Sequence, residues 1–175
     1  MKILGIYIVN ITDKTCRYKD HLLFLNPFSR RSIRELIQEF AIHAAESLND
    51  PERKIFQHQE FSFSCQRQQN DAIVIVTDHE YPSRVAFELL RNLFEDNTDR
   101  NLARTLETRQ DGTDAISRVI TGLDETMVIT HENIDKVIAR GHDIDQLVER
   151  SARLSSTSKI FYKTAKKHNR CCHIS

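Results

Sequence analysis

The aromatic residues of this chain are distributed unevenly, and this limits where a compact core can form. Eleven of the thirteen Phe and Tyr residues lie at or before Phe94, and all three prolines lie in the first 82 residues. Aromatic side chains supply much of the volume of a core. We therefore expect a folded domain at residues 1–98, a linker at 99–110, a proline-free periodic segment at 111–170 and a short tail at 171–175.

The first half of the chain alternates between strand-like and helix-like patterns. Strands are predicted for ILGIYIV, HLLFL, KIFQHQEFSFSC and DAIVIVTD. Helices are predicted for SRRSIRELIQEFAIHAAESL and YPSRVAFELLRNLFED, where apolar residues recur every three or four positions. Ser29 or Ser32 is expected to cap the first helix, with Glu35 completing a capping box. The order β-β-α-β-β-α predicts an α+β domain with helices packed on an antiparallel sheet.

Composition and motifs argue against several classes of function. The formal net charge is zero, so nucleic acid is not an expected partner. Neither GxxxxGK[ST] nor GxGxxG occurs, and no CxxC is present among the four cysteines. We therefore predict no catalytic residue, no metal site and no cofactor. No run of about 18 apolar residues occurs, so no membrane-spanning helix is predicted either.

From Ile116 onward, side chains can be followed in alternating steps of three and four residues, the spacing of a coiled-coil seam. Nine of its sixteen positions are apolar, in the series Ile116, Val119, Leu123, Thr126, Thr130, Asn133, Val137, Arg140, Ile144, Leu147, Ser151, Leu154, Ser158, Phe161, Ala165 and His168. A homodimer would bury two copies of Arg140 against each other, at a cost of several kcal/mol. Two interpretations follow: a solvated surface helix, or a helix whose partners supply hydrogen-bond acceptors opposite Arg140.

The segment around Arg140, DKVIARGHDIDQLVERS, resembles the arginine-type SNARE motif, whose central layer places one arginine among three glutamines from partner helices. TGLDETMVITHENIDKVIAR and STSKIFYKTAKKHNRCC extend the resemblance on both sides. In the first half, DHEYPSRVAFELL and SRRSIRELIQEF resemble a longin domain. With its double-cysteine tail, the chain resembles the prenylated longin-domain R-SNAREs of the synaptobrevin superfamily from Met1 to Ser175.

This resemblance implies a longin (profilin-like) domain followed by a SNARE coiled-coil helix. It implies an R-SNARE that assembles with three Q-SNARE helices and drives vesicle fusion in ER–Golgi, endosomal or vacuolar transport, rather than an enzyme. Arg140 would form the central layer of the bundle. The seam residues expected beside it are Val119, Leu123, Asn133, Val137, Ile144, Leu147, Leu154 and Phe161. The alternative is a longin-type trafficking adaptor or scaffold that binds partner helices without driving fusion.

The C-terminus has the pattern of a lipidated tail. Cys172-His173-Ile174-Ser175 fits the C-a-a-X motif, and a terminal Ser is typical of farnesylation. A single lipid gives only reversible binding, and the resemblance implies palmitoylation of the adjacent Cys171. Basic residues near the tail favour anionic lipid, namely Lys159, Lys163, Lys166, Lys167 and Arg170. We expect a cytoplasmic protein that attaches reversibly to the cytosolic face of Golgi, endosomal, vacuolar or vesicle membranes.

The resemblance also implies a closed form, in which the longin domain binds the SNARE segment and the lipid in an apolar groove beside its first helix. Phe40 and Tyr81 are the groove residues expected here. A phenylalanine associated with the closed form in the family aligns with Glu39, and Phe40 follows one residue later. Because a carboxylate in an apolar groove is costly, either Phe40 takes that role or the chain is more open.

Overall fold

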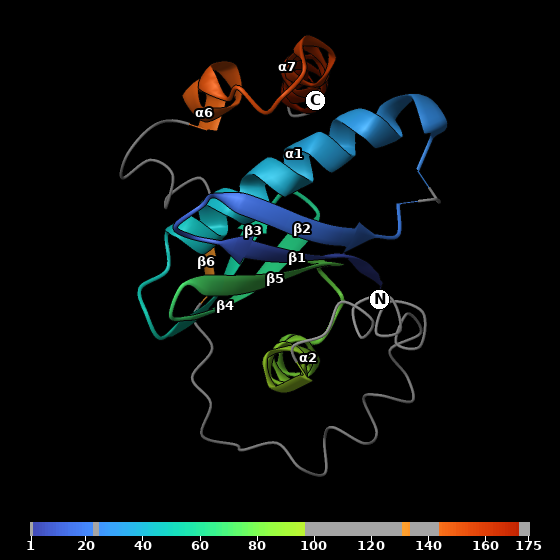
Figure 1. Ribbon diagram of the computed structural model, residues 1–175. Helices are drawn as coiled ribbons and strands as arrows, with labels where there is room; N and C mark the ends of the chain where they lie inside the picture. Colours follow the sequence, from blue (N-terminus) through green and yellow to red (C-terminus); the bar gives the residue numbers. More distant parts are fainter. Residues whose placement is uncertain (1, 23–24, 97–130, 134–143, 172–175) are drawn as a thin grey trace.

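The computed structural model describes residues 2–22, 25–96, 131–133 and 144–171, and a six-stranded sheet lies at its centre (Figure 1). The strands are β1 (Ile3–Asn10), β2 (Thr15–Asp20), β3 (Glu52–His58), β4 (Phe61–Gln68), β5 (Asp71–Asp78) and β6 (His131–Asn133). Their spatial order is β2-β1-β5-β4-β3-β6. All pairs are antiparallel except β3 with β6, which is parallel. The predicted α+β class with an antiparallel sheet is confirmed.

Two predicted strand assignments were wrong. The second strand is Thr15–Asp20 and not HLLFL, because a turn with Lys14 at φ 52° starts a mostly exposed edge strand that lacks apolar alternation. Leu22, from the predicted strand, is 1% exposed and belongs to the core. The segment KIFQHQEFSFSC contributes to both β3 and β4, which are separated by a turn with Gln59 at φ 51°. The order before the second helix is therefore β-β-α-β-β-β.

The described part of the chain contains four helices: α1 (Pro27–Glu46), α2 (Ser83–Asp96), α6 (Ile144–Arg150) and α7 (Ser156–Cys171). α1 and α2 cover opposite faces of the sheet, and α6 and α7 lie on the outer side of α1 (Figure 1). None of these helices combines the length and apolar composition that a bilayer span requires.

The cap of α1 differs from the prediction of Ser29 or Ser32. Asn26 is the N-cap, its side-chain oxygen accepts a hydrogen bond from the Phe28 N–H at 3.0 Å, and Pro27 follows it. Proline suits this position because the first N–H groups of a helix have no intrahelical partner. Glu35, expected to complete a capping box, is directed toward the C-terminal segment instead.

β1 contributes side chains to two hydrophobic cores, one under each helix. Leu4, Tyr7 and Val9 face α1, whereas Ile3 and Ile6 face α2. Strict alternation would put Ile6 on the same face as Leu4. The pairing with β5 shifts register between Ile3 and Gly5, and such a bulge reverses the direction of the following side chains. A Cβ on Gly5 would lie 2.8 Å from Cε2 of Tyr7, so this close approach favours glycine.

The C-terminal segment, expected as one coiled-coil helix, is divided in this structure. It forms β6, then α6, then α7, with residues 151–155 between the two helices. Ser155 precedes α7 and caps it, because its Oγ accepts a hydrogen bond from the Ser158 N–H at 3.3 Å. An amphipathic helix gains most of its stability from the surface against which it packs. Here that surface is α1, where the sequence predicted partner helices.

The core on the α1 side yields a stability prediction. Phe63 is 0% exposed and Phe28 is 94% exposed. We expect Phe63→Ala to lower the free energy of unfolding by about 3–5 kcal/mol, because it leaves a cavity, and Phe28→Ala to change it by less than about 0.5 kcal/mol. Urea denaturation of both variants measures the difference, and similar losses would contradict the core assignment.

Candidate functional site

The candidate site is the interface between α1 and the C-terminal helices α6 and α7. Three of the predicted seam residues, Ile144, Leu147 and Leu154, are 6%, 9% and 6% exposed and belong to the same core cluster as Phe40 of α1. Phe161, a fourth, is partly buried against this cluster. The apolar stripe that was expected to face partner helices therefore packs against α1 in this structure.

Glu39 of α1 is the charged centre of this interface. Its side chain is only 3% exposed, and one carboxylate oxygen accepts a hydrogen bond from Nε of Arg153 at 2.8 Å. Nε2 of His43 lies 3.3 Å from the other oxygen. Burial raises the pKa of Glu39, but hydrogen bonds from His43, Arg153 and Ser151 outweigh it, and the pKa is lowered to about 2. Glu39 is thus a buried, ionised partner of the segment and does not face the apolar groove.

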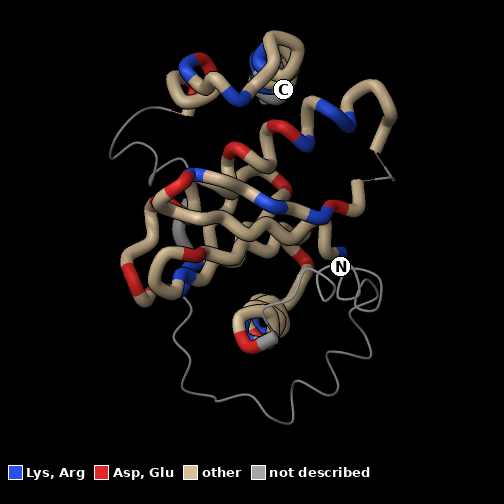
Figure 2. Tube along the Cα trace, in the orientation of Figure 1, with Lys and Arg blue, Asp and Glu red and all other residues tan. Residues whose placement is uncertain are grey.

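Glu35, one turn earlier on α1, forms hydrogen bonds with the N-terminal end of α7. Its Oε2 accepts hydrogen bonds from the Ser155 N–H at 2.9 Å and from Ser158 Oγ at 2.7 Å. Burial raises the pKa of Glu35, but the hydrogen bonds from Ser155, Ser158 and Arg31 prevail and lower it to about 2. α1 therefore presents two carboxylates, and both receive donors from residues 153–158. Figure 2 shows acidic positions along α1 and basic positions at α6 and α7.

The depressed pKa values determine how this interface responds to pH. Because Glu35 and Glu39 have folded-state pKa values of about 2, against an ordinary value of 4.5, their contribution to stability is fully present above about pH 4.5. It is lost as the pH falls from there toward 2. The two carboxylates therefore remain ionised across the physiological range.

An apolar cavity of about 520 Å³ lies beside α1, between it and α7. Phe40 lines this cavity, is 4% exposed, and makes edge-to-face contacts with the rings of His58 and Tyr162, at centroid distances of 4.9 and 6.5 Å. The other apolar lining residues are Leu4, Leu25, Ile33, Leu36, Ile37, Phe61, Phe161 and Ala165. Adjacent residues of α1 thus have different roles: Phe40 lines the cavity, and Glu39 accepts a hydrogen bond from Arg153.

Tyr81, the second expected groove residue, does not line this cavity. It lies on the opposite face of the sheet, 4% exposed, in the cluster under α2. Its N–H donates to the carbonyl of Asp78 in the turn that precedes α2, and this turn directs it to that side. The groove assignment of Tyr81 is therefore corrected.

The remaining predicted site residues lie outside the description of the structure. Arg140, Val119, Leu123, Val137 and Cys172 belong to ranges that it does not describe, as does the expected linker at 99–110. Asn133 ends β6 and Cys171 ends α7, and only their backbone is described. The roles of these residues stay predictions.

Sequence reasoning missed several residues of the interface. Arg153, Ser155 and Tyr162 contact α1 directly, and Val148 is 1% exposed. Tyr162 could have been singled out from the sequence, because it is one of only two aromatic residues after Phe94. The partnership of Arg153 with Glu39 spans 114 residues of sequence and leaves no local pattern.

Comparison with known proteins identifies both halves. The Longin family model, described as a regulated-SNARE-like domain, matches residues 19–112, and the Synaptobrevin model matches residues 115–174. The chain is 33% identical to "Synaptobrevin homolog ykt6" of Schizosaccharomyces pombe over 197 aligned positions, covering 99% of this chain and 100% of that protein. It is 33% identical to "VAMP-like protein YKT61" of Arabidopsis thaliana over 166 positions, 84% and 83% of the two chains.

A third relative, "Synaptobrevin homolog YKT6" of Saccharomyces cerevisiae, is 39% identical over 122 positions, 58% of this chain and 61% of that protein. The longin model covers more than half of the chain, and the Schizosaccharomyces pombe relative aligns along nearly its whole length. The resemblance drawn from the sequence is thereby confirmed. This chain belongs to the family of longin-domain synaptobrevins related to Ykt6, the R-SNARE proteins of vesicle trafficking and membrane fusion.

Proposed function

We propose that this R-SNARE alternates between a closed form, in which the longin domain holds the SNARE segment, and an open form that assembles with three Q-SNARE helices. One observation carries the proposal: seam residues Ile144, Leu147 and Leu154 are buried in the α1-side core. The same side chains cannot pack at once in a four-helix bundle and in that core. Docking on α1 therefore competes with assembly, and the closed form is inactive in fusion.

The open form acts through its heptad seam. Arg140 sits in the central layer, where the partner helices supply glutamine side chains that accept its hydrogen bonds. A buried arginine is destabilising without such acceptors, so this layer selects partners and aligns the register. Burial of the apolar seam residues on both sides of it releases free energy, which brings the two membranes together.

Attachment depends on the cysteine tail, since fusion requires that the helix end be held to its membrane. Cys172 carries a farnesyl group and Cys171 a palmitoyl group, because one chain alone gives only marginal binding. The protein cycles between the cytosol and the cytosolic face of Golgi, endosomal, vacuolar or vesicle membranes. In the closed form the apolar cavity beside Phe40 offers a surface for the lipid.

The closed form is tested at Arg153. Arg153→Ala removes the guanidinium from buried Glu39 and leaves His43 in place, and we expect it to weaken docking by about 1–2 kcal/mol. This is less than the 3–5 kcal/mol typical of a fully buried pair, because Arg153 is 41% exposed. Amide hydrogen exchange of residues 35–43 should rise, and assembly with Q-SNARE helices should accelerate. Arg91→Ala, which removes a guanidinium from α2, is the matched control. Unchanged exchange in Arg153→Ala would contradict the proposal.

Arg140 distinguishes a fusion protein from an adaptor. We expect Arg140→Ala to retain membrane attachment but to impair assembly with three Q-SNARE helices and liposome fusion, because the central layer loses its charged donor. Binding measured by native electrophoresis and fusion by lipid mixing provide the readouts. Normal assembly and fusion in this variant would support the adaptor alternative and eliminate the central-layer role.

The two cysteines are expected to act in sequence. Cys172→Ser should leave the protein in the soluble fraction and unable to support fusion, whereas Cys171→Ser should allow only transient membrane contact. Cell fractionation, together with the intact mass of the C-terminal peptide, measures both. Wild-type membrane association of both variants would rule out the lipid anchor.

A further inference from the structure

The charges of the two C-terminal helices are segregated. α7 contains five basic residues and no acidic one: Lys159, Lys163, Lys166, Lys167 and Arg170. α6 contributes two carboxylates, Asp145 and Glu149, and one basic residue, Arg150, at its end. The two helices are joined by only residues 151–155, so the acidic helix and the basic helix lie side by side on the outer side of α1 (Figure 1).

Three lysines of α7 make polar contacts with α6. Nζ of Lys166 donates hydrogen bonds to both carboxylate oxygens of Asp145, at 2.5 and 2.6 Å. Nζ of Lys163 lies 2.6 Å from a carboxylate oxygen of Glu149, and its hydrogen bond lowers the pKa of that carboxyl group. Nζ of Lys159 donates to the backbone carbonyl of Glu149 at 2.6 Å. Two of the five basic residues of α7 thus have a carboxylate of α6 as partner, and a third donates to a backbone carbonyl.

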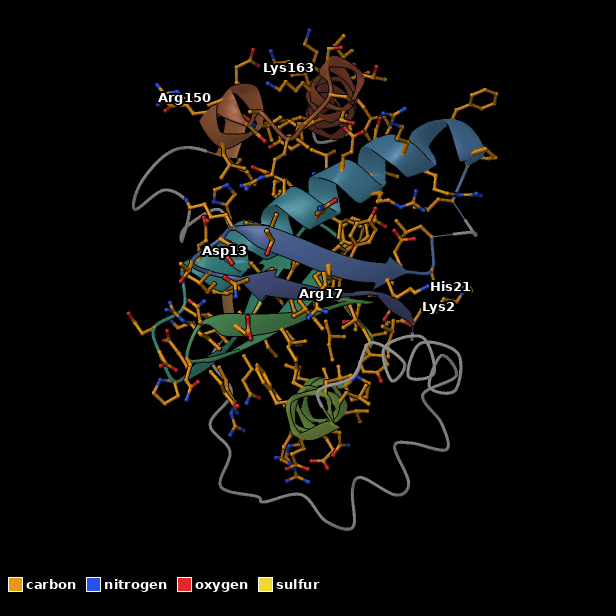
Figure 3. The ribbon with its side chains drawn as sticks, in the orientation of Figure 1. Lys2, Asp13, Arg17, His21, Arg150 and Lys163 are labelled. Carbon is orange, nitrogen blue, oxygen red and sulfur yellow. The ribbon has the colours of Figure 1, made fainter. Side chains whose placement is uncertain are left out.

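These contacts differ from the one between Glu39 and Arg153, because water reaches them. The side chains of Lys163 and Glu149 are 60% and 57% exposed, and those of Lys166 and Asp145 are 30% and 46% exposed. Exposed pairs contribute little to stability and exchange partners readily. Lys163 lies on the side of α7 that faces away from the sheet (Figure 3), so a large anionic surface can approach it while α7 is still docked.

We propose that the carboxylates of α6 mask the positive charges of Lys163 and Lys166 on α7. An anionic lipid surface displaces Glu149 and Asp145 from these two lysines. The masking proposal rests on the closed form proposed above, and it identifies an anionic lipid surface as the ligand that opens that form. By linkage, a surface that binds the lysines better when α6 is displaced shifts the population toward the undocked segment. Membrane charge therefore acts as a signal for opening.

The test uses the full chain without lipid modification and vesicles of phosphatidylcholine, alone or with about 30 mol% phosphatidylserine. We expect Asp145→Asn/Glu149→Gln to bind the anionic vesicles roughly five- to thirtyfold more tightly than the wild type, because two lysines become available. Neutral vesicles should bind neither protein measurably. Asp71→Asn/Glu95→Gln removes the same charge from exposed positions outside the cavity beside α7 and should change binding by less than about threefold.

The lysines themselves supply the decisive comparison. In a Lys163→Gln/Lys166→Gln background, the gain from Asp145→Asn/Glu149→Gln should vanish. Anionic vesicles should also raise amide hydrogen exchange of residues 35–43 in the wild type, and neutral vesicles should not. A gain that persists without the two lysines, or that equals the gain of the Asp71/Glu95 control, overturns the masking proposal. The closed form is judged separately by Arg153→Ala, so that result would leave it standing.

Discussion

The ion pair between Glu39 and Arg153 is the constraint on which the docked arrangement depends. A carboxylate that is removed from water needs a partner of opposite charge, and here that partner comes from the other end of the chain. When the segment leaves α1, Glu39 is returned to water and its charge is solvated. An interface built around such a group therefore separates at lower cost than a purely apolar one, because its exposed surface remains compatible with solvent.

α1 has two roles in consequence. One side completes the longin core through residues such as Ala41, Ala44 and Ala45, which are at most 1% exposed. The other side presents Glu35, Glu39 and Phe40 to the C-terminal segment. Under the proposed competition between docking and assembly, the apparent affinity for partner helices falls by the fraction of molecules that are docked. In that proposal, the strength of the α1 contact sets how readily the R-SNARE assembles.

Local patterns were sufficient for much of the fold. The period of the apolar residues identified α1, α2, β1 and β5. The domain boundary predicted from the loss of aromatic residues after Phe94 lies outside the described residues and stays a prediction. β2 was missed because an exposed edge strand carries no alternation. The cap was misplaced because several polar residues precede α1, and only the backbone geometry selects Asn26.

The interface itself was only half predictable. The seam residues Ile144, Leu147 and Leu154 follow from heptad spacing, and Phe40 follows from the family resemblance. Glu39 was expected to oppose docking, because the sequence does not reveal that Arg153 reaches it. Likewise, nothing in the heptad pattern indicates that the segment breaks at residues 151–155, since this break depends on Glu35 binding Ser155 and Ser158.

The short strand β6 has a consequence for the solution behaviour of the open form. It pairs with Ile55, Phe56 and Gln57 and covers the outer edge of β3. If the segment leaves the domain, that edge presents unpaired N–H and C=O groups, which can template pairing with a strand of another molecule. Arg53 and Lys54, at the start of the same strand, carry the charges by which proteins discourage such pairing. The charges of Arg53 and Lys54 therefore oppose self-association of the opened chain at one end of β3. The apolar residues Ile55 and Phe56 in the middle of the strand do not oppose it.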